Sequence, residues 1–161
     1  MACGSVRAMR AAARATAGAL LRRSPVPVLL VPESAALPRR PLVAWDGSPK
    51  AISALRHAAE LCRGLDARLE VVTVEDDERR AADRLDEARA YLAPFGVETV
   101  LRREAGEAVE QVLLLQLGPN AADLLCLGAH GHSRIVELVL GSSTEFLAGR
   151  SPVPVLCATR P

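Results

Sequence analysis

The chain has 161 residues, of which 50% are hydrophobic and 24% charged, and its net charge is +1. Because the charge is balanced and only four residues are aromatic, the chain lacks the basic surface and stacking rings of nucleic-acid-binding proteins, and we expect no nucleic-acid partner. No apolar run approaches the roughly 20 residues of a membrane helix, and four cysteines without a CxxC pair indicate buried, reduced thiols. We therefore expect a cytoplasmic protein that does not bind membranes.

The start of the chain repeats a later segment. The hexapeptide SPVPVL stands at 24–29 and again at 151–156, and a displacement of 127 positions aligns residues 4–29 with 131–156 without a gap. A self-match at a fixed offset is typical of a duplicated unit. We interpret residues 1–33 as the remnant of a first repeat, namely its last helix (about 14–22) and strand (26–31). Residues 34–40 then form a linker, and 41–161 a complete domain.

The complete domain alternates strand and helix patterns. Ser48 and Pro49 are a typical helix start, and Gly64 is expected to end that helix. The alternation predicts an α/β fold of three layers, a doubly wound sheet of five parallel strands with helices on both faces. Ligands bind such a sheet where the winding direction reverses, and Asp46 and Gly128 mark the two strand ends there. Strands are expected at 41–46, 67–74, 97–103, 122–128 and 152–158, and helices at 49–63, 78–93, 106–117 and, broken, at 133–149.

The segment 128–146, GAHGHSRIVELVLGSSTEF, is rich in glycine and hydroxyl groups. Gly128 and Gly131 bracket a turn after a buried strand, where the backbone can approach a ligand closely. Ser142 and Glu145 form an S-x-x-E capping box, so a helix is expected to begin there. Its free N–H groups and neighbouring hydroxyls suit a phosphate, although the glycines could instead only turn the chain and Ser142 only cap the helix.

The spacing G-x2-G-x9-G-S at 128, 131, 141 and 142 resembles the nucleotide motif of the universal stress protein family. VAWDGSPKA (43–51) and ADLLCLGAHG (122–131) are similar to that family's first and fourth strands. The resemblance implies a Rossmann-like fold of the adenine nucleotide alpha hydrolase-like type, with strand order 3-2-1-4-5. It also implies ATP as ligand, with Mg²⁺ entering with the phosphates. The implied binding residues are Ala44, Asp46 and Val74 at the adenine and ribose end, and Leu127, Gly128, Gly131, Gly141, Ser142, Ser143 and Thr144 around ribose and phosphates.

Other chemistry is less well supported. Trp45 is bulkier than the family's usual residue, and it either stacks on a base or fills the core, the second being favoured. Cys126, His130 and His132 do not predict a metal site, because their side chains are expected to point in different directions, and no catalytic residue stands out. We expect an ATP-binding regulatory module of the stress response with little or no hydrolysis. The alternative is a dimerisation or interaction module of the same fold that binds no nucleotide.

The last strand carries the expectation about protein partners. The resemblance implies that this strand lies at the sheet edge and pairs antiparallel with its counterpart in a partner domain. Since the counterpart is already present at 26–31, we expect it to dock beside 153–157, as an intramolecular pseudo-dimer or within a homodimer. The first repeat has Arg14 and Ala15 in place of Gly141 and Ser142, so it is not expected to bind a second nucleotide.

Overall fold

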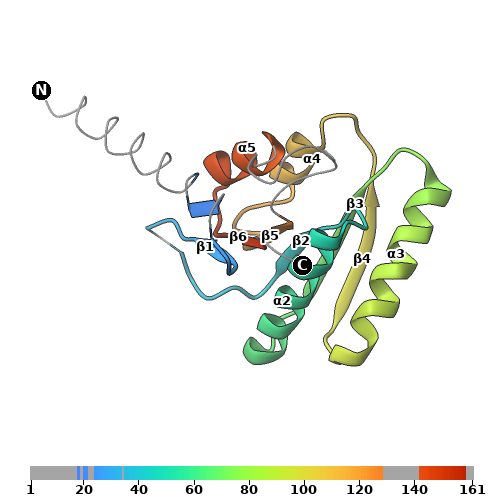
Figure 1. The fold of residues 1–161 in the computed structure, drawn as a ribbon, viewed down its shortest axis with the longest axis horizontal. Coiled ribbons are helices and arrows are strands. Elements are labelled where there is room, and N and C mark those ends of the chain that lie inside the picture. Colours follow the sequence, from blue (N-terminus) through green and yellow to red (C-terminus); the bar gives the residue numbers. More distant parts are fainter. Residues whose placement is uncertain (1–17, 19, 22–23, 34, 129–141, 159–161) are drawn as a thin grey trace, which may run out of the picture.

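The structure is a computed structural model that describes residues 18, 20–21, 24–33, 35–128 and 142–158 (Figure 1). The elements alternate as the sequence predicts, and each of the helices α2 to α5 follows a strand. In chain order they are β1 (Val28–Leu30), β2 (Pro41–Ala44), α2 (Pro49–Leu65), β3 (Leu69–Val74), α3 (Glu78–Leu92), a 3-10 turn (Ala93–Phe95), β4 (Thr99–Glu104), α4 (Val109–Leu115), β5 (Leu124–Gly128), α5 (Ser142–Arg150) and β6 (Val155–Ala158).

The strands form one sheet in the order β1-β6-β5-β2-β3-β4. All pairings among β2 to β6 are parallel, and reading from β4 toward β6 these five strands have the predicted order 3-2-1-4-5. The predicted fold class is therefore confirmed, and the chain reverses its winding direction between β2 and β5.

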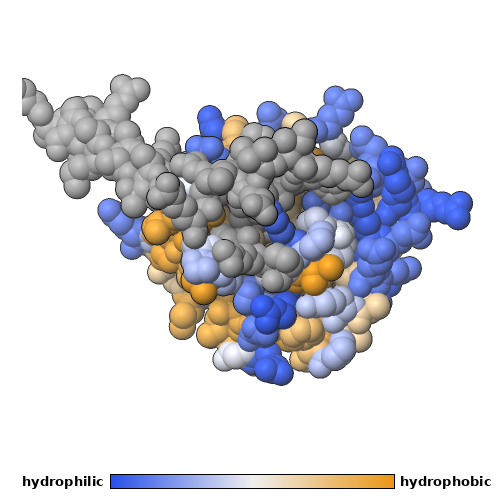
Figure 2. Space-filling model, in the orientation of Figure 1, coloured by the Kyte–Doolittle hydropathy of each residue, from blue (hydrophilic) through white to orange (hydrophobic). Residues whose placement is uncertain are grey.

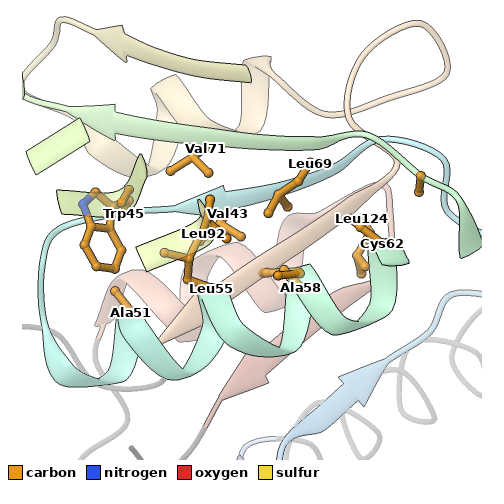
Figure 3. Packing of buried hydrophobic residues seen from close by; sticks show 14 residues of the cluster. Val43, Trp45, Ala51, Leu55, Ala58, Cys62, Leu69, Val71, Leu92 and Leu124 are labelled. Carbon is orange, nitrogen blue, oxygen red and sulfur yellow. The ribbon is translucent and has the colours of Figure 1, made fainter. Parts of the chain in front are cut away.

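Two hydrophobic cores lie on the two faces of the sheet, which makes three layers. One core packs α2 and α3 against side chains such as Val43, Leu69 and Leu124 (Figure 3). The other packs α4 and α5 against side chains such as Leu42 and Leu125. Since successive residues of a strand point to opposite faces, a strand buried on both faces must be apolar throughout, as β5 is.

The N-terminal strand docks where the repeat predicts. β1 pairs antiparallel with β6, and Val28, Leu29 and Leu30 lie opposite Cys157, Leu156 and Val155. The expected docking of 26–31 beside 153–157 is confirmed, but the ladder is shorter than these bounds and joins only Val28–Leu30 to 155–157. Gly18, Leu20 and Leu21 are helical, but most of the helix expected at 14–22, and most of the segment expected at 133–149, lies outside the described residues.

The boundaries of several elements differ from the predictions. Gly64 does not end α2, because the helix continues to Leu65 and the left-handed residue that ends it is Asp66, with φ 52°. The first strand ends at Ala44 rather than at position 46. Helix α4 spans Val109–Leu115 rather than 106–117: Gly106, with φ 143°, is not helical, and the helix ends in a turn capped at Gln116. Among the described helices, none combines the length and apolar character that crossing a bilayer would require.

Candidate functional site

A cavity of about 430 Å³ opens at the carboxyl ends of β2, β3 and β5, where the winding direction reverses. This volume lies within the roughly 300–1,000 Å³ of small-molecule sites. Helices α4 and α5 close its other side. The lining residues are Ala44, Trp45, Asp46, Ser48, Ala51, Val72, Val74, Arg84, Glu107, Val109, Glu110, Leu113, Leu127, Gly128, Ser143, Thr144 and Leu147.

The turn from β2 into α2 is shaped by hydrogen bonds of its own side chains. The carboxylate Oδ1 of Asp46 accepts the backbone N–H of Ser48 at 2.9 Å, and Gly47 between them has φ 77°. The hydroxyl of Ser48 in turn accepts the N–H of Ala51 at 3.1 Å, so Ser48 is the N-cap of α2, as predicted. These bonds hold the Asp46 backbone at the rim of the cavity.

Gly128 lies at the end of β5, against the first turn of α2. A Cβ on this residue would stand 2.7 Å from the carbonyl carbon of Lys50 and 2.8 Å from the backbone nitrogen of Ala51. Both distances are shorter than van der Waals contact allows, and both partners are backbone atoms. The glycine is therefore needed for the strand and the helix to approach each other, in addition to the close ligand approach that the sequence suggested.

Trp45 belongs to the core and also forms one wall of the cavity. Only 4% of the residue is exposed, and its indole N–H donates to the backbone carbonyl of Arg84 at 2.8 Å. Figure 3 places the ring beside the first turn of α2, near Ala51. The Arg84 guanidinium is held by Glu75, with 3.1 Å between Nη1 and Oε2. The favoured interpretation of Trp45 as a core residue is confirmed.

The first turn of α5 meets α4 at the opposite wall. The Ser143 hydroxyl donates a hydrogen bond to Oε1 of Glu110, and this bond is the main cause that lowers the pKa of Glu110. Thr144 is buried beside it, with 4% exposed. A carboxylate of α4 and a hydroxyl of α5 thus form one polar end of the cavity.

The remainder of the cavity wall is largely apolar. Its aliphatic side chains come from the sheet and from α4 and α5, and a flat heterocycle such as adenine can be buried against them. The polar end carries the hydroxyls of Ser143 and Thr144, which can hydrogen-bond a ribose or phosphate, the Ser143 hydroxyl only by leaving its acceptor Glu110. The cavity therefore fits a nucleotide in size and in the distribution of polar groups. The apolar lining residues are Ala44, Val72, Val74, Leu113, Leu127 and Leu147.

The cavity brings together most of the residues that the sequence selected. Ala44, Asp46, Val74, Leu127, Gly128, Ser143 and Thr144 all line it. Gly131 and Gly141 lie outside the described residues, as do His130 and His132. Ser142 is the first residue of α5, as the capping box predicted, but its side chain is outside the description.

The sequence reasoning missed Arg84, Glu107 and Glu110. A signal for the two glutamates was available, because the loop after β4 must lie at the same edge of the sheet as the ends of the other parallel strands. In the part of the chain that the structure describes, no group of three or more His, Cys, Asp or Glu residues could hold a metal ion.

Comparison with known proteins identifies the family. The family model "Universal stress protein family" matches residues 75–159. The chain belongs to the universal stress protein family. A relative from Synechocystis, universal stress protein Slr1230, is 34% identical over 139 residues, which are 85% of this chain and 48% of the relative.

Solved structures of the universal stress protein family share the fold. A universal stress protein from Archaeoglobus fulgidus is 28% identical, with a TM-score of 0.73 over 89% of this chain and 53% of its own. A universal stress protein in complex with cAMP is 25% identical, with a TM-score of 0.62 over 78% of this chain and 100% of its own. The chain spans about half the length of the Synechocystis and Archaeoglobus relatives.

Proposed function

We propose that this universal stress protein binds adenine nucleotides, ATP among them, and acts in the cytoplasm as a regulatory module of the stress response with little or no hydrolysis. The observation that carries the proposal is the cavity at the reversal point of the sheet, lined by seven residues that the nucleotide motif implies: Ala44, Asp46, Val74, Leu127, Gly128, Ser143 and Thr144. The cAMP complex of a relative supports an adenine ligand.

In the proposed complex the apolar wall buries the adenine, and the start of α5 receives the phosphates. Ala44, Asp46 and Val74 contact the base and ribose, and Gly128, Ser143 and Thr144 face the ribose and phosphates. Gly131, Gly141 and Ser142 are assigned to the phosphates by the family motif alone. A divalent cation such as Mg²⁺ enters with ATP, since the described residues provide no cage for it.

Titration calorimetry with ATP, AMP and cAMP tests the site. Val74→Arg places a long, charged side chain in the cavity, and we expect it to reduce affinity at least about tenfold, because the base loses its apolar wall. The matched control is Val97→Arg, at another half-buried valine that does not line this cavity. Equal affinities in both variants and the native protein would contradict the assignment. Mass spectrometry of ligands released from the denatured protein would identify what is bound on purification.

A second measurement concerns turnover. No residue is assigned as a general base, so we expect phosphate release from ATP to stay well below the roughly 1 s⁻¹ of a slow enzyme. Sustained release above that rate, abolished by Val74→Arg, would make the protein an ATPase instead.

A second candidate function is protein interaction, and an apolar groove favours it. The groove, of about 690 Å³, lies between β1, β6, the linker that follows β1 and the end of α2, and is lined by residues such as Leu29, Leu37 and Leu156. Figure 2 shows hydrophobic side chains gathered on the side where β1 lies.

We propose that residues 1–33 are the remnant of a first repeat, joined by linker 34–40 to the domain 41–161. On that view β1 takes the partner strand's place in an intramolecular pseudo-dimer, with a homodimer through β6 as the alternative.

A further inference from the structure

Among the described residues that line the cavity, negative charges outnumber positive ones. Among the described lining residues there are three carboxylates, Asp46, Glu107 and Glu110, and one guanidinium, Arg84. The guanidinium is already engaged by Glu75, at 3.1 Å. A polyphosphate that enters this cavity therefore meets more negative than positive charge on the described part of the wall.

Glu110 is the carboxylate that bears most directly on the phosphate end. It accepts the hydrogen bond of the Ser143 hydroxyl, and Ser143 is one of the groups proposed to hold phosphate. The same contact lowers the pKa of Glu110 and so favours the charged form of the carboxylate. A phosphate that binds Ser143 must take this hydroxyl from Glu110 while lying beside a negative charge.

We propose that Glu110 makes the site discriminate among adenine nucleotides by the negative charge at their phosphate end. Metal-free ATP is then the disfavoured ligand, whereas adenosine, cyclic or monophosphate nucleotides and metal-neutralised ATP bind relatively better. The inference rests on the proposed nucleotide site, and it assigns the charge preference of that site to one side chain.

The physical basis is the repulsion of like charges in a partly desolvated cleft. Two like unit charges about 4 Å apart near a protein surface repel each other strongly enough to change an affinity tenfold. Solvent and salt reduce this repulsion, and a divalent cation on the phosphates removes most of it. Glu110 is half-buried, so its charge is only partly screened by solvent.

Calorimetric titrations of the full chain with adenosine, ATP without metal, and ATP with Mg²⁺ test the proposal. Glu110→Gln keeps the shape and a hydrogen-bond acceptor but removes the charge. We expect this variant to bind metal-free ATP on the order of tenfold more tightly, to bind adenosine within about twofold of the native protein, and to depend less on Mg²⁺. The matched control is Glu107→Gln, which removes the same charge from an exposed lining residue.

The outcomes separate this inference from the proposed function. An unchanged ratio of ATP to adenosine affinity in Glu110→Gln, with adenosine still bound, would overturn the inference alone. An equal gain in Glu107→Gln would also overturn it, because the effect would then be one of overall charge. Absence of binding of adenosine and ATP by the native protein and both variants would overturn the proposed function, and the inference with it. A circular-dichroism melt verifies that each variant is folded.

Discussion

At the scale of single residues, Gly128 has two roles, of which the sequence indicated only one. The glycine-rich motif and the buried strand before it indicated a ligand site at this position. The sequence could not indicate that the missing Cβ also makes room for the backbone of Lys50 and Ala51, because that contact joins residues almost 80 positions apart in the chain. The same applies to Glu110 and Ser143, which meet only in the folded chain.

The first prediction compares the same substitution at two glycines. Gly128→Ala puts a Cβ less than 3 Å from two backbone atoms of α2, and we expect it to lower the free energy of unfolding by about 1–3 kcal/mol, as overpacking does. Gly64→Ala, within α2, meets nothing within 4 Å, and we expect it to raise stability by up to about 1 kcal/mol. Urea unfolding measures both. A Gly128→Ala variant as stable as the native protein would show that α2 can shift away.

At the scale of elements, the sequence predicted most helices and strands, and its errors lie at their ends. Helix α2 was recognised from Ser48, Pro49 and the apolar spacing that follows, and these residues do begin it. The predicted end of α2 at Gly64 is wrong. Gly64 remains helical, with no neighbour within 4 Å of where a Cβ would be, and Asp66 adopts the left-handed conformation that ends the helix. Aspartate is less common than glycine in that conformation, and tertiary contacts decide such cases.

The linker illustrates an attachment that no local pattern indicated. Asp123, just before β5, accepts the backbone N–H groups of Arg39 and Arg40, both at 2.8 Å. The Arg40 guanidinium donates to the carbonyls of Asn120 and Pro119, both at 3.0 Å. The start of β2 is thereby held to the start of β5, which fixes where the linker joins the sheet.

The second prediction tests this attachment. Asp123→Ala leaves two backbone N–H groups without their acceptor, and we expect a loss of about 1–3 kcal/mol in the free energy of unfolding. Asp86→Ala is the control, because Asp86 pairs with Arg89 on the exposed face of α3 and should contribute less than about 1 kcal/mol. Equal effects in chemical denaturation would mean that the linker is held by other contacts.

At the scale of the whole molecule, the β1–β6 ladder has the symmetry of the repeat. When the repeats are aligned at the offset of 127 positions, Leu29 corresponds to Leu156, and these two residues lie opposite each other at the centre of the ladder. Val28 corresponds to Val155, and Leu30 to Cys157. The pair Val28–Cys157 therefore has its equivalent in the pair Val155–Leu30, which is also observed. The ladder thus maps onto itself, as the contact between two equivalent strands would. The pairing could be predicted because the repeated hexapeptide marks two equivalent strands and the family resemblance implies that such strands pair. The groove beside the ladder could not be predicted, because α2 forms one of its walls.

The two faces of β1 differ in burial: one is covered by the core and the other is open. Val28 and Leu30 pack against the core that contains Leu21 and Leu147. Leu29, on the opposite face, is 52% exposed and lies in the apolar groove, and Val31 just beyond the strand is 60% exposed. On the β6 side of this groove stands α2, but no described helix stands in the equivalent place beside β1. A charge on β1 should therefore have very different effects at neighbouring positions.

The last prediction uses that alternation to test whether β1 substitutes for a partner strand. Leu30→Glu buries a carboxylate between β1 and the core, and we expect β1 to detach and the protein to lose about 2–4 kcal/mol. The freed edge of β6 then exposes unpaired backbone groups, and we expect two chains to associate through it, so that light scattering shows a dimer. Deleting residues 1–33 should produce the same dimer. Leu29→Glu is the control: its side chain faces the groove, so stability and mass should change little. If the deletion and Leu30→Glu left both the melting temperature and the mass of the native chain unchanged, β1 would not be protecting the edge of β6, and the pseudo-dimer would have to be abandoned.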